Sequence, residues 1–279
     1  MLNPLALQDL IDRALEEDLG FGDLTGLSLD ADATATFALN ARQEMVLAGV
    51  EVAVQVFRTV VPRTNIAVEA HDGDRLGVGA PILTVSGTAR GLLTAERTAL
   101  NFLQHLSGIA TLTAAYVAAI EGTGCTLLDT RKTTPGLRML EKHAVTCGGG
   151  RNHRLALDDG IMLKDNHIAV AGSIPAAIAR ARMVAPALSR VEVECDRIDQ
   201  VREALDGGAD MLMLDNMDPA AMREAVALVN GRVPLEASGG VTLETIRAIA
   251  ETGVTYVSVG RITQSAPAVD IGMDAISRP

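Results

Sequence analysis

Two patterns of apolar and polar positions divide the chain near residue 110. Before that point, apolar residues at helical spacing predict helices over residues 5–19 and 50–60. Short alternating runs between them predict strands over residues 34–39, 45–48, 65–70 and 82–85. A strong apolar helical pattern over residues 92–121 then predicts a long helix that bridges two domains. The pattern therefore predicts an N-terminal α+β sandwich domain over residues 1–110, including the start of the bridging helix, with one sheet face covered.

Beyond residue 110, short buried strands alternate with helices, as parallel α/β architecture requires. The predicted strands cover residues 125–128, 161–163, 191–193, 211–214, 233–236 and 256–259. A seventh strand over residues 144–147 would help to close a parallel α/β barrel, and an open doubly wound sheet is the alternative. We therefore expect a seven-stranded barrel over residues 111–279, with a C-terminal tail that can return to the first domain.

A polar or glycine residue stands at or just after the end of each predicted strand. These residues are Asp129, Thr130, Lys164, Glu194, Asp215, Ser238, Gly239 and Gly260. The carboxyl ends of the strands of a closed α/β barrel face one mouth, where substrate sites are built. The pattern therefore predicts one shared site.

Positive charge is concentrated in one stretch of an acidic chain. The formal net charge is -11, yet all three lysines lie within residues 129–167 beside four arginines. These cations are Lys132, Lys142, Lys164, Arg131, Arg138, Arg151 and Arg154. Such a cluster indicates a site for a small molecule with several anionic groups. We expect Arg138, Lys142 and Arg151 to be solvated or ion-paired rather than ligands.

Composition excludes several other classes of function. A net charge of -11, no Trp and 2% aromatic residues argue against nucleic acid as a partner. The N-terminal segment lacks a basic signal-peptide region, and no apolar run approaches membrane-spanning length, so we expect no membrane association. The three cysteines are widely spaced and without a CxxC pair, which is typical of reduced thiols. We therefore expect a cytoplasmic protein.

Motifs along nearly the whole chain resemble those of the quinolinate phosphoribosyltransferase family. They occur in the family's order and read ALEEDLGFGDLT, AERTALNFLQHLSGIAT, DTRKTTPGLRMLEKHAV, GGGRNHR, LKDNH, EVEC, LDNM, EASGG and VGRIT. The resemblance implies a condensation of quinolinate with phosphoribosyl pyrophosphate. Its products would be nicotinate mononucleotide, pyrophosphate and carbon dioxide, with magnesium (Mg²⁺) as the cofactor.

The resemblance also implies roles for individual residues. Arg131, His153, Arg154 and Lys164 match positions that bind quinolinate. Arg97 matches another such position, which in this family comes from the neighbouring subunit of a homodimer. The two carboxylates of quinolinate require several cations in a fixed geometry, which guanidinium groups provide. We therefore expect a site shared between two subunits, and a higher oligomer is also open.

Other matched positions concern the sugar donor. Lys132, next to Thr130 and Arg131, matches a position near the pyrophosphate, where a cation would offset charge on the leaving group. Glu194 and Asp215 match ligands of the ribose hydroxyls and of magnesium, which prefers hard oxygen donors. The ribose 5-phosphate would lie on two glycine-containing turns, formed by Ser238, Gly239 and Gly240 and by Val259, Gly260 and Arg261. The second turn, with Gln264 just after it, departs most from the family's usual residues.

Four other interpretations remain to be weighed. Relatives encoded beside molybdate-transport components share the fold, and a catalytically silent sensor of phosphorylated metabolites could use the same cations. The paired carboxylates argue against the sensor, because acidic groups would weaken the binding of a phosphate. A zinc site from His143, Cys147 and His153 is disfavoured, because it lacks tetrahedral partner spacing. The aspartates of the segment HDGD are expected to shape a turn rather than to bind a metal.

Overall fold

The computed structural model describes residues 4–277, which form two compact units. The first unit comprises residues 1–114, 134–149 and 263–279, and the second comprises residues 115–133 and 150–262. The predicted division at residue 110 comes with a C-terminal tail that can return to the first domain, and the segment 134–149 belongs to the first unit as well. The long helix α3 (Ala89–Ala119), predicted over residues 92–121, contributes residues to both units.

The first unit is built around a four-stranded antiparallel sheet. Its order is β12 (Ile271–Ser277), β1 (Thr34–Ala41), β5 (Pro81–Thr88) and β3 (Asn65–Val68). Two short strands, β2 (Met45–Val46) and β4 (Arg75–Leu76), pair separately. Alternate residues of β1, including Phe37 and Leu39, are buried, which is the pattern of a sheet with one covered face.

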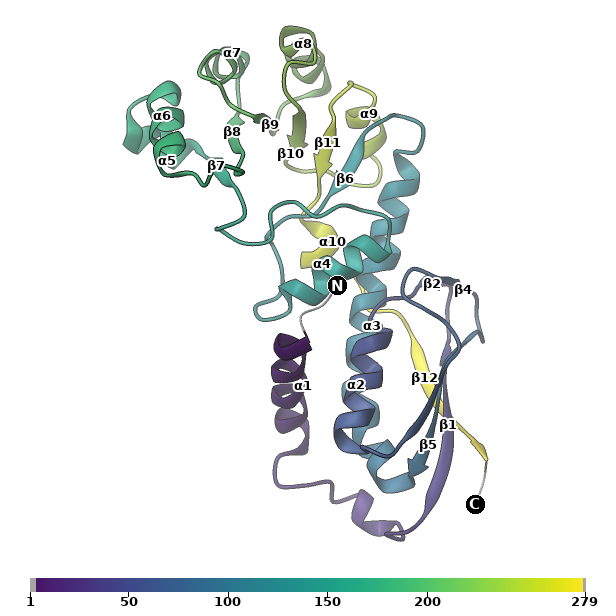
Figure 1. The fold of residues 1–279 in the computed structure, drawn as a ribbon. Coiled ribbons are helices and arrows are strands. Elements are labelled where there is room, and N and C mark those ends of the chain that lie inside the picture. Colours follow the sequence, from purple (N-terminus) through teal and green to yellow (C-terminus); the bar gives the residue numbers. More distant parts are fainter. Residues whose placement is uncertain (1–3, 278–279) are drawn as a thin grey trace. The chain divides into compact units, whose positions relative to one another are not determined.

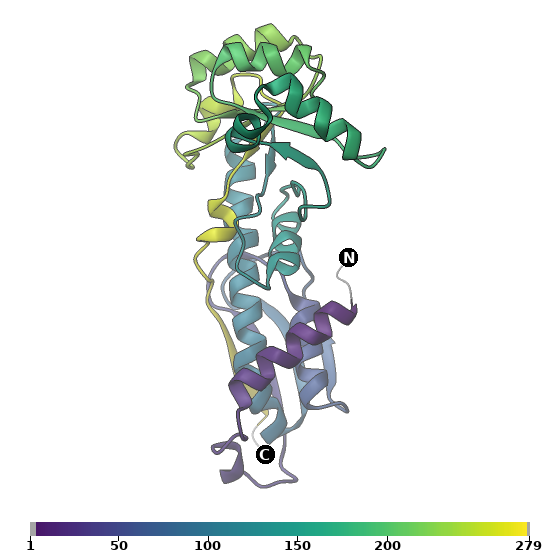
Figure 2. The same ribbon diagram turned by 90° about the vertical axis from the view of Figure 1, so that its left-hand side faces the viewer.

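Helices cover that face of the sheet (Figures 1 and 2). They are α2 (Val50–Val60) and the first part of α3, and α1 (Pro4–Leu19) packs against α2. The unit also contains α4 (Arg138–Cys147) and the short η1 (Gly26–Ser28). Gly108 of α3 allows a close approach by the segment that leads to β12. A Cβ at Gly108 would lie 2.2 Å from the carbonyl oxygen of Pro267. This contact explains why glycine interrupts an otherwise apolar helical pattern.

The second unit is a six-stranded parallel sheet with helices on its outer side (Figure 1). The strand order is β6 (Thr126–Leu128), β11 (Tyr256–Ser258), β10 (Leu235–Ser238), β9 (Met211–Asp215), β8 (Val191–Cys195) and β7 (Ile161–Leu163). The helices are α5 (Asp165–Ala171), α6 (Ile174–Val184), α7 (Ile198–Asp206), α8 (Pro219–Val229) and α9 (Ile246–Ala250), and α10 (Arg261–Gln264) lies at the edge of the unit. All six predicted strands are present, so the predicted α/β architecture with a separate N-terminal α+β domain is confirmed.

The expected seventh strand at residues 144–147 is wrong, because this segment is the end of helix α4. Leu140, Ala144 and Val145 are buried at helical spacing, and a short apolar run does not by itself distinguish a strand from a helix. The position beside β6 is instead occupied by a single parallel bridge from Leu128 to Arg151. Within residues 4–277, no ladder joins β6 to β7 at the two ends of the sheet.

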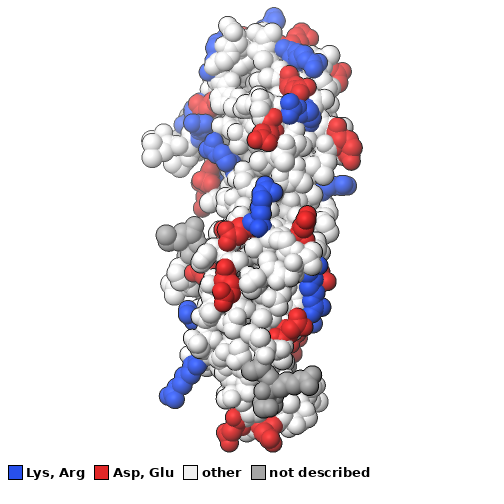
Figure 3. Space-filling view, turned by 90° about the vertical axis from the view of Figure 1, so that its right-hand side faces the viewer, with Lys and Arg blue, Asp and Glu red and all other residues white. Residues whose placement is uncertain are grey.

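Acidic and basic side chains are interspersed on the face shown in Figure 3. This mixture is what solvation of a charged surface requires, and it contrasts with the cation-rich stretch of residues 129–167. One expected surface cation departs from the prediction, because Lys142 on α4 is buried, with 2% of its surface exposed. No helix in the described part of the chain is long and apolar enough to cross a bilayer.

Candidate active site

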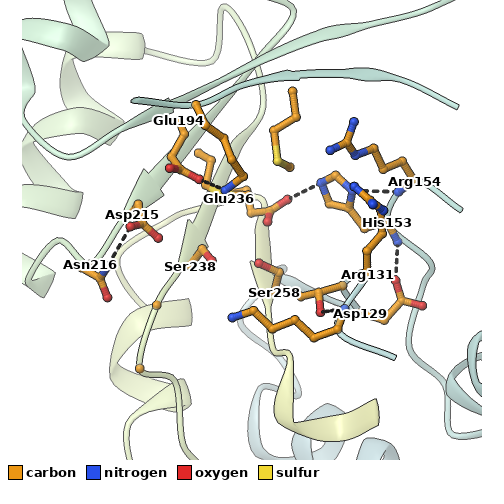
Figure 4. A pocket seen from close by; sticks show the side chains of 17 residues that line it. Asp129, Arg131, His153, Arg154, Glu194, Asp215, Asn216, Glu236, Ser238 and Ser258 are labelled. Carbon is orange, nitrogen blue, oxygen red and sulfur yellow. Dashed lines mark hydrogen bonds and ion pairs between the residues drawn. The ribbon is translucent and has the colours of Figure 1, made fainter. Parts of the chain in front are cut away.

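A cavity of about 610 Å³ opens at the carboxyl ends of the parallel strands in the second unit. Its wall alternates between basic, acidic and small residues from all six strands and the loops that follow them (Figure 4). The lining residues are Asp129, Thr130, Arg131, Lys132, His153, Arg154, Met162, Lys164, Glu194, Met213, Asp215, Asn216, Glu236, Ser238, Gly239, Gly240 and Ser258. The predicted convergence of strand ends on one mouth is therefore present.

Arginine side chains form the cationic side of the cavity. Burial lowers the pKa of Arg154, and the nearby charge of Arg131 lowers it further, while Glu192 acts in the opposite direction. Arg154 donates from Nη1 to the carbonyl oxygen of Gly160 at 2.9 Å, which fixes its direction. The Nε atom of Arg131 is buried without a hydrogen-bond partner in the described structure. A guanidinium with an unpaired N–H beside a second guanidinium forms a strong site for carboxylates.

Two lysines complete the cationic side. Lys132 is exposed, and its backbone N–H donates to Thr130 Oγ1 at 3.0 Å. A Cβ at Gly260 would lie 2.8 Å from Lys132 Cδ, so the glycine leaves space for this side chain. The Nζ atom of Lys164 contacts Glu194 Oε2 in an ion pair. The backbone N–H of Lys164 donates to His167 Nδ1 at 3.0 Å, which gives His167 a structural role at the start of α5.

Glu194 and Asp215 lie on the neighbouring strands β8 and β9 and both line the cavity. Asp215 accepts a hydrogen bond from Asn216 Nδ2 at 2.7 Å, and Glu194 is paired with Lys164. Two carboxylates on adjacent strand ends provide the hard oxygen donors that magnesium prefers. These side chains therefore fit a cation-binding role, in which an ion would compete with Lys164 for Glu194.

The turn after β10 requires glycine for a close approach. Gly239 has a φ angle of 96°, and a Cβ there would lie 2.1 Å from Asn216 Oδ1. Asn216 itself has a φ angle of 53°, and its backbone N–H donates to the carbonyl oxygen of Ser238 at 2.9 Å. The turns after β9 and β10 are therefore joined by this hydrogen bond and close contact, and Gly240 lines the cavity beside them.

His153 is held from several sides by the protein. Its Nε2 atom lies 3.0 Å from Glu192 Oε2 and 3.3 Å from Glu236 Oε2. Its Nδ1 atom accepts the backbone N–H of Arg154 at 2.7 Å. We therefore assign the ring proton to Nε2, where it faces two carboxylates. Figure 4 shows His153 and Glu236 pointing toward each other across the cavity floor.

The surroundings of His153 shift the pKa values of this cluster. Burial lowers the pKa of His153, but the hydrogen bonds with Glu192 and then Glu236 outweigh burial and raise it. The lone pair that Nδ1 offers to Arg154 opposes a second ring proton and limits this rise. Burial raises the pKa of Glu192, and the like charge of Glu236 adds to the increase although His153 opposes it. The cluster therefore places a carboxylate, that of Glu192, close enough to Arg154 to offset part of its charge.

Asp129 braces the loop that carries His153. This carboxylate is fully buried and accepts from Asn152 Nδ2 at 2.6 Å and from the backbone N–H of His153 at 2.9 Å. A buried carboxylate with several donors is stable in its charged form. Asp129 therefore connects the end of β6 to the His153 loop.

Most of the predicted site residues line this cavity, and four do not. The four are Arg97, Val259, Gly260 and Arg261. Arg97 is exposed on α3 in the first unit, and Arg261 is exposed at the start of α10. Val259 is buried, and Gly260 lies against Lys132 as described above.

Sequence reasoning missed residues that share a strand face with the predicted ones. Asn216 and Ser258 belong to the strand ends, and Met162, Met213 and Glu236 each lie two positions before Lys164, Asp215 and Ser238. Because alternate residues of a strand point to the same side, this spacing could have identified the last three.

Comparisons with known proteins place both parts of the chain in one family. Residues 23–107 match the model "Quinolinate phosphoribosyl transferase, N-terminal domain", and residues 109–274 match the model of its C-terminal domain. The chain is 43% identical over 273 residues to the probable nicotinate-nucleotide pyrophosphorylase (carboxylating) of Bacillus subtilis (strain 168), covering 98% of this chain and 94% of that protein. It is 45% identical over 276 residues to the nicotinate-nucleotide pyrophosphorylase (carboxylating) of Mycobacterium leprae (strain TN), covering 96% and 97%.

A solved structure gives the same result. The nicotinate-nucleotide pyrophosphorylase from Francisella tularensis superposes with a TM-score of 0.96 at 38% identity, covering 99% of this chain and 98% of that chain. The similarity therefore extends through both units at high identity. This chain belongs to the quinolinate phosphoribosyl transferase family.

Proposed function

We propose that this chain transfers a phosphoribosyl group from phosphoribosyl pyrophosphate to quinolinate with decarboxylation, as a step in NAD biosynthesis. The products are nicotinate mononucleotide, pyrophosphate and carbon dioxide. Family membership supports the reaction, and one observation carries it for this chain. Four cations, Arg131, Lys132, Arg154 and Lys164, line the same cavity as the carboxylates Glu194 and Asp215. A dicarboxylate and a magnesium-bound pyrophosphate need both kinds of group.

Quinolinate binds at the arginine side of the cavity. Arg131 and Arg154 supply guanidinium donors for its two adjacent carboxylates, because paired N–H groups match carboxylate geometry. Lys164 adds a third cation once it exchanges its partner Glu194 for the substrate. His153 has both ring nitrogens engaged by the protein. It therefore shapes the pocket and orients the backbone of Arg154, rather than donating to quinolinate.

The sugar donor occupies the carboxylate side. Glu194 and Asp215 would hold magnesium and the ribose hydroxyls, and magnesium would offset the negative charge of the pyrophosphate. Ser238, Gly239 and Gly240 would bind the ribose 5-phosphate through the backbone of their turn, with Gly240 open to the cavity. In the second predicted phosphate turn, Gly260 acts by leaving space for Lys132, which would stabilise the departing pyrophosphate.

The reaction is a displacement at the anomeric carbon of the ribose. The lone pair of the pyridine nitrogen forms the new bond to carbon, while the bond to the pyrophosphate oxygen breaks with its electron pair. The resulting pyridinium then stabilises the carbanion left when the adjacent carboxylate departs as carbon dioxide, and this carbanion takes a proton from water. The protein orients the reactants and stabilises charge, which supplies a large share of catalysis in such sites.

Arg97 provides support for a composite site. It is exposed on α3 in the first unit and does not line the cavity of the second. We assign it to the quinolinate pocket of a neighbouring subunit, so that a homodimer is the smallest active form. Mixing inactive Arg97→Ala and Arg154→Ala chains should then restore part of the activity through mixed dimers. Absence of recovery, with subunit exchange demonstrated, would contradict the shared site. The higher oligomer and the cytoplasmic location stay predictions.

A product assay tests the proposed reaction directly. The purified chain is incubated with quinolinate, phosphoribosyl pyrophosphate and magnesium, and the formation of nicotinate mononucleotide is measured by chromatography. A parallel reaction replaces quinolinate by nicotinic acid, which has only one carboxylate. We expect product from quinolinate and little from nicotinic acid, because a buried pair of guanidinium groups would be left partly unpaired. Equal rates with both acids would refute the assignment, and binding without turnover would favour a sensor.

A further inference from the structure

A second cluster of metal-binding side chains lies in the first unit, outside the cavity. His143 and Cys147 lie one turn apart on α4 and therefore share a face of the helix. Asp72 comes from the turn between β3 and β4, far away in the sequence. Asp72 Oδ2 lies 2.7 Å from His143 Nε2, and Cys147 Sγ lies 3.5 Å from the same nitrogen. One ligand atom of each residue lies within 4.8 Å of the other two.

The three donor atoms lie close enough together for one cation to replace the proton that joins His143 to Asp72 in the metal-free protein. A ring nitrogen carries either one proton or one lone pair, yet this nitrogen faces both a carboxylate and a thiol. If it donates its proton to Asp72, it cannot also accept the thiol proton of Cys147. A cation between the three atoms would take a lone pair from each of them at once. The three residues are only partly buried, so an ion could enter from solvent.

The carboxylate is held in position for such a role. The other oxygen of Asp72, Oδ1, accepts the backbone N–H of Val50 at 2.9 Å, at the start of α2. Hydrogen bonds of this kind orient metal ligands and are a common part of metal sites. The expectation that the HDGD aspartates shape a turn is therefore compatible with a second role for Asp72. His153, once considered with His143 and Cys147, belongs instead to the second unit.

The donor atoms identify the kind of metal. A thiolate is a soft ligand, which disfavours magnesium and calcium, and a set of nitrogen, oxygen and sulfur donors suits zinc. The charges also balance, because one carboxylate and one thiolate neutralise a divalent ion while the imidazole stays neutral. Three protein ligands leave a fourth tetrahedral position for water. We propose that Asp72, His143 and Cys147 form a zinc site that fastens α4 to the turn between β3 and β4.

Zinc binding at this site would release protons. The hydrogen bond with Asp72, followed by that with Cys147, raises the pKa of His143 to about 10, so the ring is protonated at neutral pH in the absence of metal. Coordination requires a neutral imidazole and a thiolate. Each bound ion would therefore displace the proton that His143 Nε2 carries in the metal-free protein.

Calorimetry on the full chain tests the proposal. Wild-type protein is stripped with a chelator, returned to buffer with excess magnesium and titrated with zinc chloride. Magnesium would fill the oxygen-donor site of Glu194 and Asp215, and the cluster variants show which zinc binding belongs to the new site. We expect saturation at one zinc per chain, with a dissociation constant on the order of 1 µM or lower. Cys147→Ser and Asp72→Asn should each weaken binding by about tenfold or more.

Matched variants and a spectroscopic probe complete the test. Cys125→Ser and His71→Asn change the same residue types outside the cluster and should bind zinc like the wild type. Cobalt in place of zinc should give a sulfur-to-cobalt charge-transfer band in the wild type and in Cys125→Ser, but not in Cys147→Ser. Lack of saturable zinc binding by the wild type, or wild-type affinity in Cys147→Ser, overturns the proposal. If a cluster variant fails to fold, the wild-type cobalt spectrum decides, and absence of the thiolate band overturns it.

Discussion

The carboxylate of Glu236 should influence catalysis through His153 rather than through direct contact with substrate. Glu236 is fully buried, and its Oε2 atom lies 3.3 Å from His153 Nε2. Glu236→Gln keeps the volume of the side chain and removes its charge. The contact is an ion pair, because neither oxygen of Glu236 has a hydrogen-bond partner in the described structure. An interaction with a charged group contributes about 1.5–3 kcal/mol, and its loss would let the ring move. Because Arg154 donates its backbone N–H to that ring, movement of the ring would shift the backbone that carries the guanidinium.

This energy corresponds to a defined loss of rate. Since about 1.4 kcal/mol equals a factor of ten, Glu236→Gln should lower kcat/KM for quinolinate by roughly 10- to 150-fold. The KM for phosphoribosyl pyrophosphate should change little, because the carboxylate side of the cavity is untouched. The melting temperature should change little, because the lost pair with His153 is offset by the removal of a like charge from beside Glu192.

A double-mutant cycle with His153→Asn shows whether Glu236 positions His153 or contacts the substrate itself. If Glu236 acts through the ring, Glu236→Gln should lower kcat/KM by less than about threefold in a protein that already carries His153→Asn. Glu141→Gln serves as the matched control, because Glu141 is also fully buried and also pairs with a histidine, His105, at 2.9 Å. It should leave the KM for quinolinate unchanged. Equal losses from Glu236→Gln in both backgrounds would refute the reasoning and place Glu236 in contact with substrate.

Three further perturbations test other parts of the structure. Arg154→Ala should lower kcat/KM for quinolinate by about a hundredfold or more, near 3 kcal/mol, and a wild-type rate would remove Arg154 from the site. Gly108→Ala should lower the free energy of unfolding, measured by denaturant titration, by about 2 kcal/mol, because its Cβ would lie 2.2 Å from a backbone carbonyl oxygen. The control Gly77→Ala has open space around its Cβ and should lower it by under about 0.5 kcal/mol. The pKa of His143 rises from its ordinary value of 6.5 to about 10. In metal-free protein, the stability contributed by its pair with Asp72 should therefore be complete below pH 6.5 and lost as the pH rises toward 10. An identical decline of stability with pH in His143→Asn would contradict this.

The fold was predictable where the apolar pattern had a clear period. The strands of the second unit were identified because short buried runs alternate with amphipathic helices, and their polar ends identified the mouth. The pattern failed at residues 144–147, because four residues are too few to show whether the period is that of a strand or a helix. It also missed β12, because the pairing of this strand with β1 joins distant parts of the chain.

The candidate site was predictable only as far as motifs and local order define it. Lys164, Glu194 and Asp215 follow strands directly and were found. The cluster of Asp72 with His143 could not be found, because these residues are 71 positions apart and meet only after folding. Lys142 shows the converse error, because it belongs to the cationic stretch in sequence but is buried in the first unit.

The buried acids of the second unit explain how a cationic pocket can exist in the folded chain before substrate arrives. Arg131 and Arg154 repel each other, and burial makes their charges more costly, as the lowered pKa of Arg154 shows. Glu192 opposes that shift, and Glu236 lies beside it on the cavity floor. An uncompensated pair of half-buried guanidinium groups would weaken the fold. The acids therefore allow the arginines to be preorganised for a dianion, and a variant that lacks both acids should lose the folded pocket rather than bind its substrate more tightly.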